Sequence, residues 1–130
     1  MSTRANVKIT DAQGTALWFY RHYDGDPETT IPGLSKFMRW AADGTIRKNA
    51  SQAGGWLIAL GMQEYKTGPE PCSKRANASF GHTWKVGAYE PTDCQHGDIN
   101  YLYIMDLDAE EIRVEKISDV YWHTVVSDFR

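Results

Sequence analysis

The chain has 130 residues, of which 42% are hydrophobic and 24% are charged, and its formal net charge is −3. This length favours a single domain over residues 1–130, and the composition is that of a folded protein rather than a disordered one. No apolar run reaches the roughly 20 residues that cross a bilayer, and the N-terminus lacks the apolar core of a secretory signal. Two cysteines are too few for a disulfide scaffold, so a reducing, cytoplasmic compartment is expected.

The charge is divided unevenly along the chain. Residues 1–66 hold eight basic and six acidic side chains, whereas residues 67–130 hold six and eleven. Neither half has the clustered basic face that is typical of nucleic-acid-binding proteins, so direct binding to nucleic acid is not expected. The acidic half could present a negative patch to a basic partner, although a solvated acidic face is the commoner outcome.

The first half of the chain predicts two strands followed by two helices. Apolar and polar residues alternate over residues 5–10, and after a turn a second strand, rich in aromatic residues, spans residues 15–23. The two strands should form an antiparallel hairpin. A helix is predicted from Thr30–Pro32 up to Gly44, and a second helix should begin at Asn49, whose side chain can cap it.

The second helix is expected to be largely buried. The residues predicted to face the core are Ala53, Trp56, Leu57 and Leu60. Its Gly54-Gly55 pair costs about 1 kcal/mol per glycine relative to alanine. Close packing of this backbone against the aromatic strand, on Trp18 or Trp40, would offset that cost.

The second half of the chain begins with a long irregular region and ends with strands. Residues 66–97 are rich in proline and glycine, with one short strand expected at 84–89. Strands are then predicted over residues 99–107, 111–117 and 121–126. The sequence therefore predicts an α+β fold of about five antiparallel strands with two helices packed on one face, in the order β-β-α-α-β-β-β.

Two short segments carry residues that could bind a metal ion. His22 and Asp24 follow the aromatic strand, and His96 and Asp98 precede the strand at residue 99. Together they would form a two-histidine, two-carboxylate set suited to a divalent metal and to a small metal-dependent enzyme. The alternative is structural, because aspartate and glycine also form efficient turns and the spacing matches no ligand motif.

A second inventory consists of Cys72, His82, Cys94 and His96, the ligand types of a structural zinc site. The closely spaced cysteine pair of such sites is missing, so two unpaired cysteines are the simpler interpretation. No serine or cysteine has the sequence context of a catalytic nucleophile. We therefore predict no catalytic residues and no bound cofactor.

A partner-binding surface is predicted around one turn of the second half. Asp106, Asp108, Glu110 and Glu111 cluster at the turn between the strands 99–107 and 111–117. Tyr101 and Tyr103 project from one face of the preceding strand and could supply an apolar anchor. The alternative is that the turn is acidic only because exposed turns favour solvated residues.

Several segments together resemble small proteins encoded by phages, prophages and other bacterial mobile elements. The matching segments are Ser2-Thr3-Arg4-Ala5-Asn6-Val7, Phe19-Tyr20-Arg21-His22 with Asp24-Gly25 and Pro27, Gly44-Thr45-Ile46-Arg47, Ser51-Gln52-Ala53, Gly55-Trp56-Leu57-Ile58, Leu60-Gly61, Glu64-Tyr65, His96-Gly97-Asp98-Ile99 and Tyr101-Leu102-Tyr103. They skip residues 66–95, and Asp26 departs from the pattern of the group. The group has no common activity, so the resemblance implies a genomic setting and no catalytic residues.

That setting implies a function, because small phage proteins often block host immunity, including CRISPR–Cas systems, by binding a host component stoichiometrically. The resemblance therefore implies an anti-CRISPR-like inhibitor that binds a host defence protein or effector complex in the bacterial cytoplasm. The alternatives are the metal-dependent enzyme described above and a phage accessory protein that binds nucleic acid. The basic residues available for the last role are Arg4, Lys8, Arg21, Arg47 and Lys48.

Overall fold

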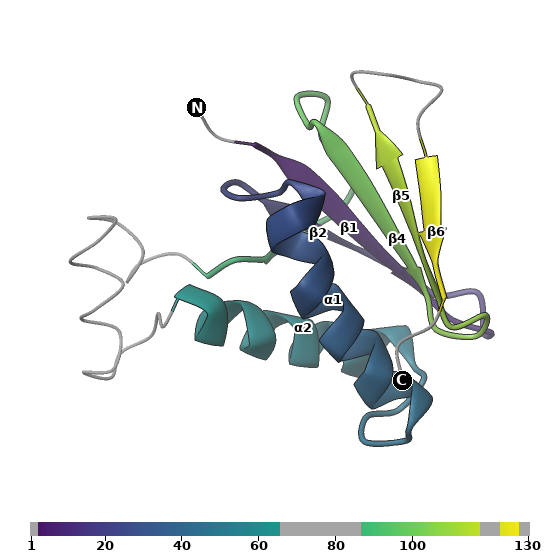
Figure 1. The fold of residues 1–130 in the computed structure, drawn as a ribbon. Helices are drawn as coiled ribbons and strands as arrows, with labels where there is room; N and C mark the ends of the chain where they lie inside the picture. Colours follow the sequence, from purple (N-terminus) through teal and green to yellow (C-terminus); the bar gives the residue numbers. More distant parts are fainter. Residues whose placement is uncertain (1–2, 66–86, 118–122, 128–130) are drawn as a thin grey trace.

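The computed structural model describes residues 3–65, 87–117 and 123–127 (Figure 1). In chain order the elements are β1 (Ala5–Thr10), β2 (Ala16–Arg21), α1 (Pro27–Ala42), α2 (Ala50–Tyr65), β3 (Glu90–Thr92), β4 (Tyr101–Asp106), β5 (Glu111–Lys116) and β6 (His123–Val126). The protein therefore has the predicted α+β class. Of the strand expected at 84–89, residues 84–86 lie outside the described residues, 87–89 are not in a ladder, and a short strand follows as β3.

The six strands form one mixed sheet in the order β3-β2-β1-β4-β5-β6. β1 pairs antiparallel with β2, as predicted, but it pairs parallel with β4, with Val7 opposite Tyr103. The sheet therefore has six strands where about five were predicted, and the prediction that all of them are antiparallel was wrong. A parallel pair needs a long crossover between its strands, and the two helices between β2 and β3 lie within that crossover.

Local side chains set the helix boundaries. The Asp26 carboxylate accepts a hydrogen bond from the Thr29 amide at 3.1 Å, so α1 begins at Pro27, earlier than predicted. Gly44 follows the helix with φ of +85°, the left-handed conformation expected there. At α2, Asn49 accepts from the Gln52 amide at 3.1 Å, as its cap position predicted.

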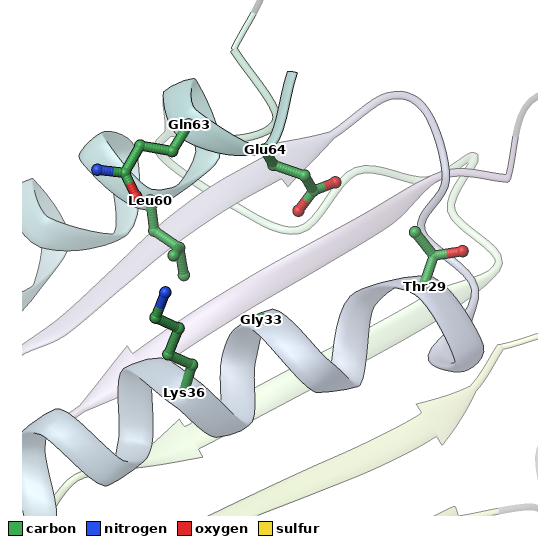
Figure 2. Close-up of a pocket in the computed structure, with 6 residues that line it drawn as sticks. All are labelled: Thr29, Gly33, Lys36, Leu60, Gln63 and Glu64. Atoms are coloured by element: carbon green, nitrogen blue, oxygen red, sulfur yellow. The ribbon is translucent and has the colours of Figure 1, made fainter. Parts of the chain in front are cut away.

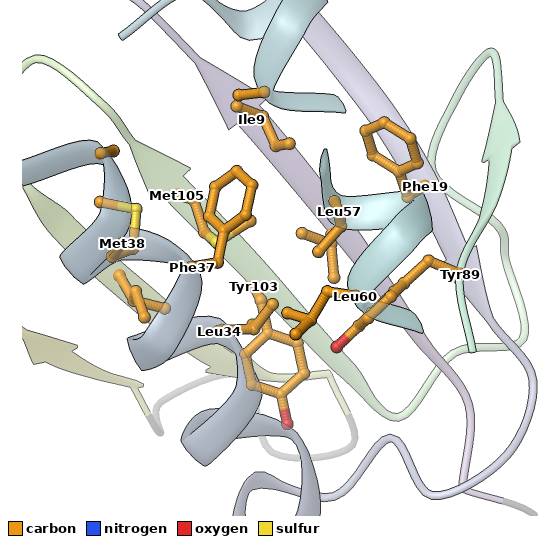
Figure 3. Close-up of a cluster of buried hydrophobic side chains, with 14 of the residues drawn as sticks. Ile9, Phe19, Leu34, Phe37, Met38, Leu57, Leu60, Tyr89, Tyr103 and Met105 are labelled. Atoms are coloured by element: carbon orange, nitrogen blue, oxygen red, sulfur yellow. The ribbon is translucent and has the colours of Figure 1, made fainter. Parts of the chain in front are cut away.

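The core lies between the helices and one face of the sheet (Figure 3). Alternate residues of β1, β2, β4 and β5 point into it, and both helices contribute to the same cluster. Its members include Ile9, Phe19, Leu34, Phe37, Met38, Leu57, Tyr89, Tyr103 and Met105. The expectation for α2 was correct at Ala53, Leu57 and Leu60 but wrong at Trp56, whose exposed fraction is 51%.

The two adjacent glycines of α2 differ in role. A Cβ atom at Gly54 would lie 2.9 Å from Phe19 Cζ, so the helix backbone packs directly on β2. At Gly55 a Cβ atom would meet nothing within 4 Å. The predicted close packing therefore holds for Gly54, with Phe19 as the partner in place of Trp18 or Trp40.

A fully buried arginine fastens α2 to the end of β2. Arg21 Nε donates to the carbonyl oxygens of Tyr23 at 2.8 Å and Asp24 at 3.1 Å, and its two Nη atoms donate to the Glu64 carboxylate. The guanidinium also lies 5.1 Å from the centre of the Tyr89 ring. Burial raises the pKa of the Tyr89 hydroxyl to about 12, so this phenol stays protonated beside the ion pair. Within the described ranges, neither helix is long and apolar enough to span a membrane.

Candidate functional site

The face of the sheet opposite the helices carries a continuous row of surface side chains. Reading from β2 to β6, the register places Trp18, Lys8, Ile104, Arg113 and Val125 beside one another. All five belong to the register positions that alternate with the core residues, and Val125 is 43% exposed. In the described part of the chain, the apolar cluster on this side contains no helical residue. We call these five residues the open-face row.

The open-face row contains aromatic, basic and aliphatic side chains, and one contact within the row joins Lys8 and Trp18. Lys8 Nζ lies 5.1 Å from the centre of the Trp18 ring, a cation–π contact that holds the indole against β1. Trp18 and Ile104 pack at the edge of a small cluster formed by Tyr20, Ile99 and Leu102. Aromatic residues and arginine are the types that most often dominate protein–protein binding energy.

A shallow hollow of about 210 Å³ lies beside the row, between β4 and β5. It is lined by Ile104, Asp106, Glu111, Arg113 and Glu115. Asp106 and Glu111 are directly opposed across the two strands, an arrangement of like charges that is unfavourable by itself. Three carboxylates surround one guanidinium, so the hollow has an excess of negative charge.

The loop before β4 closes one end of the open face. His96 stacks on Tyr20 with ring centres 4.1 Å apart, and its backbone amide donates to the buried Asn6 side chain at 2.7 Å. The Tyr20 hydroxyl lies 2.8 Å from Nδ1 of His22. The pKa of Tyr20 is raised, first by burial and then by the negative charge of Asp98. Two predicted site residues, His22 and His96, therefore meet at one tyrosine.

The predicted metal set does not assemble fully. Asp98 forms an ion pair with Arg4 at 3.5 Å, and the Asp24 carbonyl accepts from Arg21 and from the Thr30 hydroxyl. Among residues 3–65, 87–117 and 123–127, no three histidine, cysteine, aspartate or glutamate side chains lie where they could hold one metal ion. The proposed set of His22, Asp24, His96 and Asp98 is therefore not a metal centre in this fold.

The zinc inventory falls partly outside the described residues. Cys72 and His82 lie there, so the set of four is not tested. Cys94 is an exposed free thiol, and a hydrogen bond to Asp93 is the main cause that raises its pKa. His96 is placed against Tyr20 and within 3.1 Å of the Thr92 hydroxyl through Nε2.

The two tyrosines predicted as anchors lie on the core side of β4. Tyr103 is fully buried, and its hydroxyl donates to the Gly25 carbonyl at 2.6 Å. Burial raises the pKa of the Tyr103 hydroxyl far above its ordinary value. Tyr101 is half-buried against the same core. Tyr103 therefore cannot contact a partner in this fold, and the prediction for it was wrong.

Two of the four acidic residues predicted at the hairpin, Asp106 and Glu110, form contacts within the protein. Asp106 accepts hydrogen bonds from the amides of Asp108 and Ala109, both at 3.0 Å, and so stabilises the turn. Glu110 has φ of 57° and pairs with Lys48 at 2.8 Å. Asp108 is exposed, and Glu111 points into the hollow on the open face.

The basic residues considered for nucleic-acid binding do not form one surface. Arg21 is buried in the core, where it binds Glu64. Arg4 and Lys48 are held in ion pairs with acidic residues. Lys8 lies in the open-face row, so the set is divided among different parts of the fold.

The sequence analysis did not find the open-face row, because the aromatic residues of the second strand do not by themselves show which of its faces is covered. The signal that could have found the row is the alternation of Lys8 with the buried Val7 and Ile9, which places one face of β1 in solvent. Trp18 is paired with Lys8 in the hairpin, so it must share that face.

In comparisons with known proteins, no family model, curated protein or solved structure matches this chain.

Proposed function

We propose that the protein is a stoichiometric binding protein that inhibits a bacterial defence system, in the manner of an anti-CRISPR protein. The observation that carries the binding role is the open-face row, which runs over five strands on the side of the sheet whose apolar cluster, within residues 3–65, 87–117 and 123–127, contains no helical residue. The resemblance to phage and prophage proteins supports a host defence protein or effector complex as the partner.

The rigidity of the row favours binding through this face. Its side chains project from paired strands, so their backbone is already ordered before a partner covers them. Trp18 and Arg113 provide an aromatic surface and a multidentate hydrogen-bond donor on β2 and β5, each the second strand from one edge of the sheet. Ile104 lies between their strands and supplies apolar contact area.

The charge of the hollow defines the chemistry of the partner. Asp106, Glu111 and Glu115 outnumber Arg113, and the exposed Asp108 lies at the adjoining turn. A basic side chain of a partner would relieve the repulsion between Asp106 and Glu111. We therefore propose a partner with a basic groove, such as one that normally holds nucleic acid, flanked by apolar residues.

The test is titration of the purified protein against a purified CRISPR–Cas effector in a DNA-cleavage assay. A stoichiometric inhibitor reaches full inhibition near equimolar protein, whereas an enzyme inactivates its target at far lower ratios. Trp18→Ala should weaken inhibition at least about tenfold, as expected for a hot-spot residue. Trp56→Ala is the control, because Trp56 is an exposed tryptophan on α2, whereas Trp18 is half-buried on the open face.

Two outcomes would contradict this model. Inhibition at far below equimolar protein would indicate turnover, and loss of inhibition in the Trp56 variant alone would move the interface to α2. The contribution of charge is tested with Asp108→Lys and Glu111→Lys together. This variant should slow association mainly at low salt, since exposed charges act on the association rate and are screened by ions. An association rate that ignores both the reversal and the salt concentration would exclude a basic partner.

A further inference from the structure

A separate pocket of about 430 Å³ lies between the two helices, away from the open face (Figure 2). It is lined by Thr29, Gly33, Lys36, Leu60, Gln63 and Glu64. Its volume falls in the range of about 300–1,000 Å³ that is usual for small-molecule sites. The lining combines a buried apolar residue, Leu60, with side chains of both charges.

One of the positions that line the pocket is a glycine of α1. Gly33 lies inside α1, where glycine costs about 1 kcal/mol relative to alanine. Packing does not require it, since a Cβ atom there would lie 3.9 Å from Glu64 Oε1 and 4.0 Å from Leu60 Cδ2, both ordinary contacts. What the missing side chain leaves is room for a methyl-sized group in contact with both the Glu64 carboxylate and Leu60.

The charged groups lie toward different ends of this space. Figure 2 shows Lys36 and Gln63 toward one end and Glu64 nearer Thr29 toward the other. The Glu64 side chain is 26% exposed, so part of its carboxylate is accessible from the pocket. Each carboxylate oxygen has two acceptor positions, and Arg21 donates one hydrogen bond to each oxygen.

The anionic end is held in place by the core. Glu64 is fixed by the buried Arg21, which is itself fixed by two backbone carbonyl oxygens and the Tyr89 ring. A carboxylate positioned in this way need not be ordered again when a ligand binds. At the other end, Lys36 is an exposed cation whose Nζ lies 5.4 Å from the centre of the Trp40 ring.

We propose that this pocket binds a small aliphatic amino acid. The ligand's carboxylate pairs with Lys36, its ammonium group donates to Glu64, and its aliphatic side chain contacts Leu60 over Gly33. The site needs both charges of the zwitterion, because a cation and an anion face the same small space. This binding activity is independent of the proposed interaction through the open face.

The probes are L-leucine and two analogues that each lack one charged group, 4-methylpentanoate and 3-methylbutylamine. Binding is followed by chemical-shift changes in the ¹⁵N-labelled full chain. L-leucine should bind with saturable shifts on α1 and α2, and each analogue should bind at least about tenfold more weakly, because each loses one charge-assisted hydrogen bond. No saturable binding of L-leucine at millimolar concentration, or equal binding of either analogue, would overturn the proposal.

Variants of the chain provide the second test. Gly33→Leu fills the pocket without changing its charge and should abolish L-leucine binding, whereas Gly55→Leu adds the same side chain on open helix surface and should leave it unchanged. Lys36→Met should weaken binding at least about tenfold while retaining the aliphatic part of the side chain. Gly33→Ala verifies that α1 tolerates a side chain, with an unchanged or higher Tm.

The binding measurements with these variants either support or contradict the proposed amino-acid site. Wild-type affinity in Gly33→Leu or in Lys36→Met would overturn the proposal. Trp18→Ala should keep L-leucine binding, and Gly33→Leu should keep inhibition of the defence effector. Failure of the amino-acid site is therefore distinguishable from failure of the proposed function.

Discussion

The ion pair between Arg21 and Glu64 is expected to be a main determinant of stability. Glu64→Gln removes the carboxylate that balances a fully buried guanidinium, and Arg21→Met removes the donors that satisfy the Tyr23 and Asp24 carbonyls. Breaking a buried pair from one side typically costs about 3–5 kcal/mol. Because the Glu64 side chain is 26% exposed and water can solvate part of it, we expect about 3 kcal/mol for each variant. That is a large fraction of the roughly 5–15 kcal/mol that stabilises a domain.

The measurement is urea denaturation of the two single variants and the double variant. The double variant should be less destabilised than the sum of the single variants by at least about 1 kcal/mol, since the second change removes the group left unpaired by the first. Equal denaturation slopes among the four proteins would show that their unfolded states are comparable. A loss below about 1 kcal/mol in either single variant, or additive losses, would refute this account of the pair.

Three further predictions concern single positions. Trp56→Ala should cost less than about 1 kcal/mol in a denaturation experiment, against about 3–5 kcal/mol for a buried aromatic residue, because half of this side chain is in solvent. Gly54→Ala should lower the free energy of unfolding by about 1–3 kcal/mol, because the added Cβ atom clashes with Phe19. Gly55→Ala should leave it unchanged or raise it by up to about 1 kcal/mol. Equal effects of the two substitutions would contradict the packing of α2 on β2. The pKa of Asp11 is lowered from its ordinary value of 3.8, chiefly by the hydrogen bond from the Ala50 amide. The ionised carboxylate therefore stabilises the fold at pH values above 3.8. This contribution is lost as the pH falls through the lower pKa of the folded state. Asp11→Asn should therefore lower Tm at pH 7, with a difference from wild type that shrinks below about pH 4, and a difference independent of pH would argue against this role.

Neighbouring residues were sufficient to predict the local structure. Alternation over residues 5–10, the turn that follows, the cap at Asn49 and the left-handed Gly44 each depend on side chains only a few positions apart. Such patterns act through the chain's own periodicity and hydrogen bonding, so they can be recognised without knowing the fold. They determined the α+β class and the approximate bounds of most elements.

The candidate sites depended on contacts between distant residues. The parallel pairing of β1 with β4 joins positions more than 90 residues apart, and it placed Ile104 beside Lys8 and turned Tyr103 into the core. The contact between Arg21 and Glu64 likewise spans 43 positions and positions the carboxylate of the pocket between the helices. Whether Trp18 or Trp56 is exposed is decided by which surfaces pack together, since both residues are equally apolar. The sequence by itself determined which segments are strands and helices, and only the tertiary structure decided which of their faces remained open.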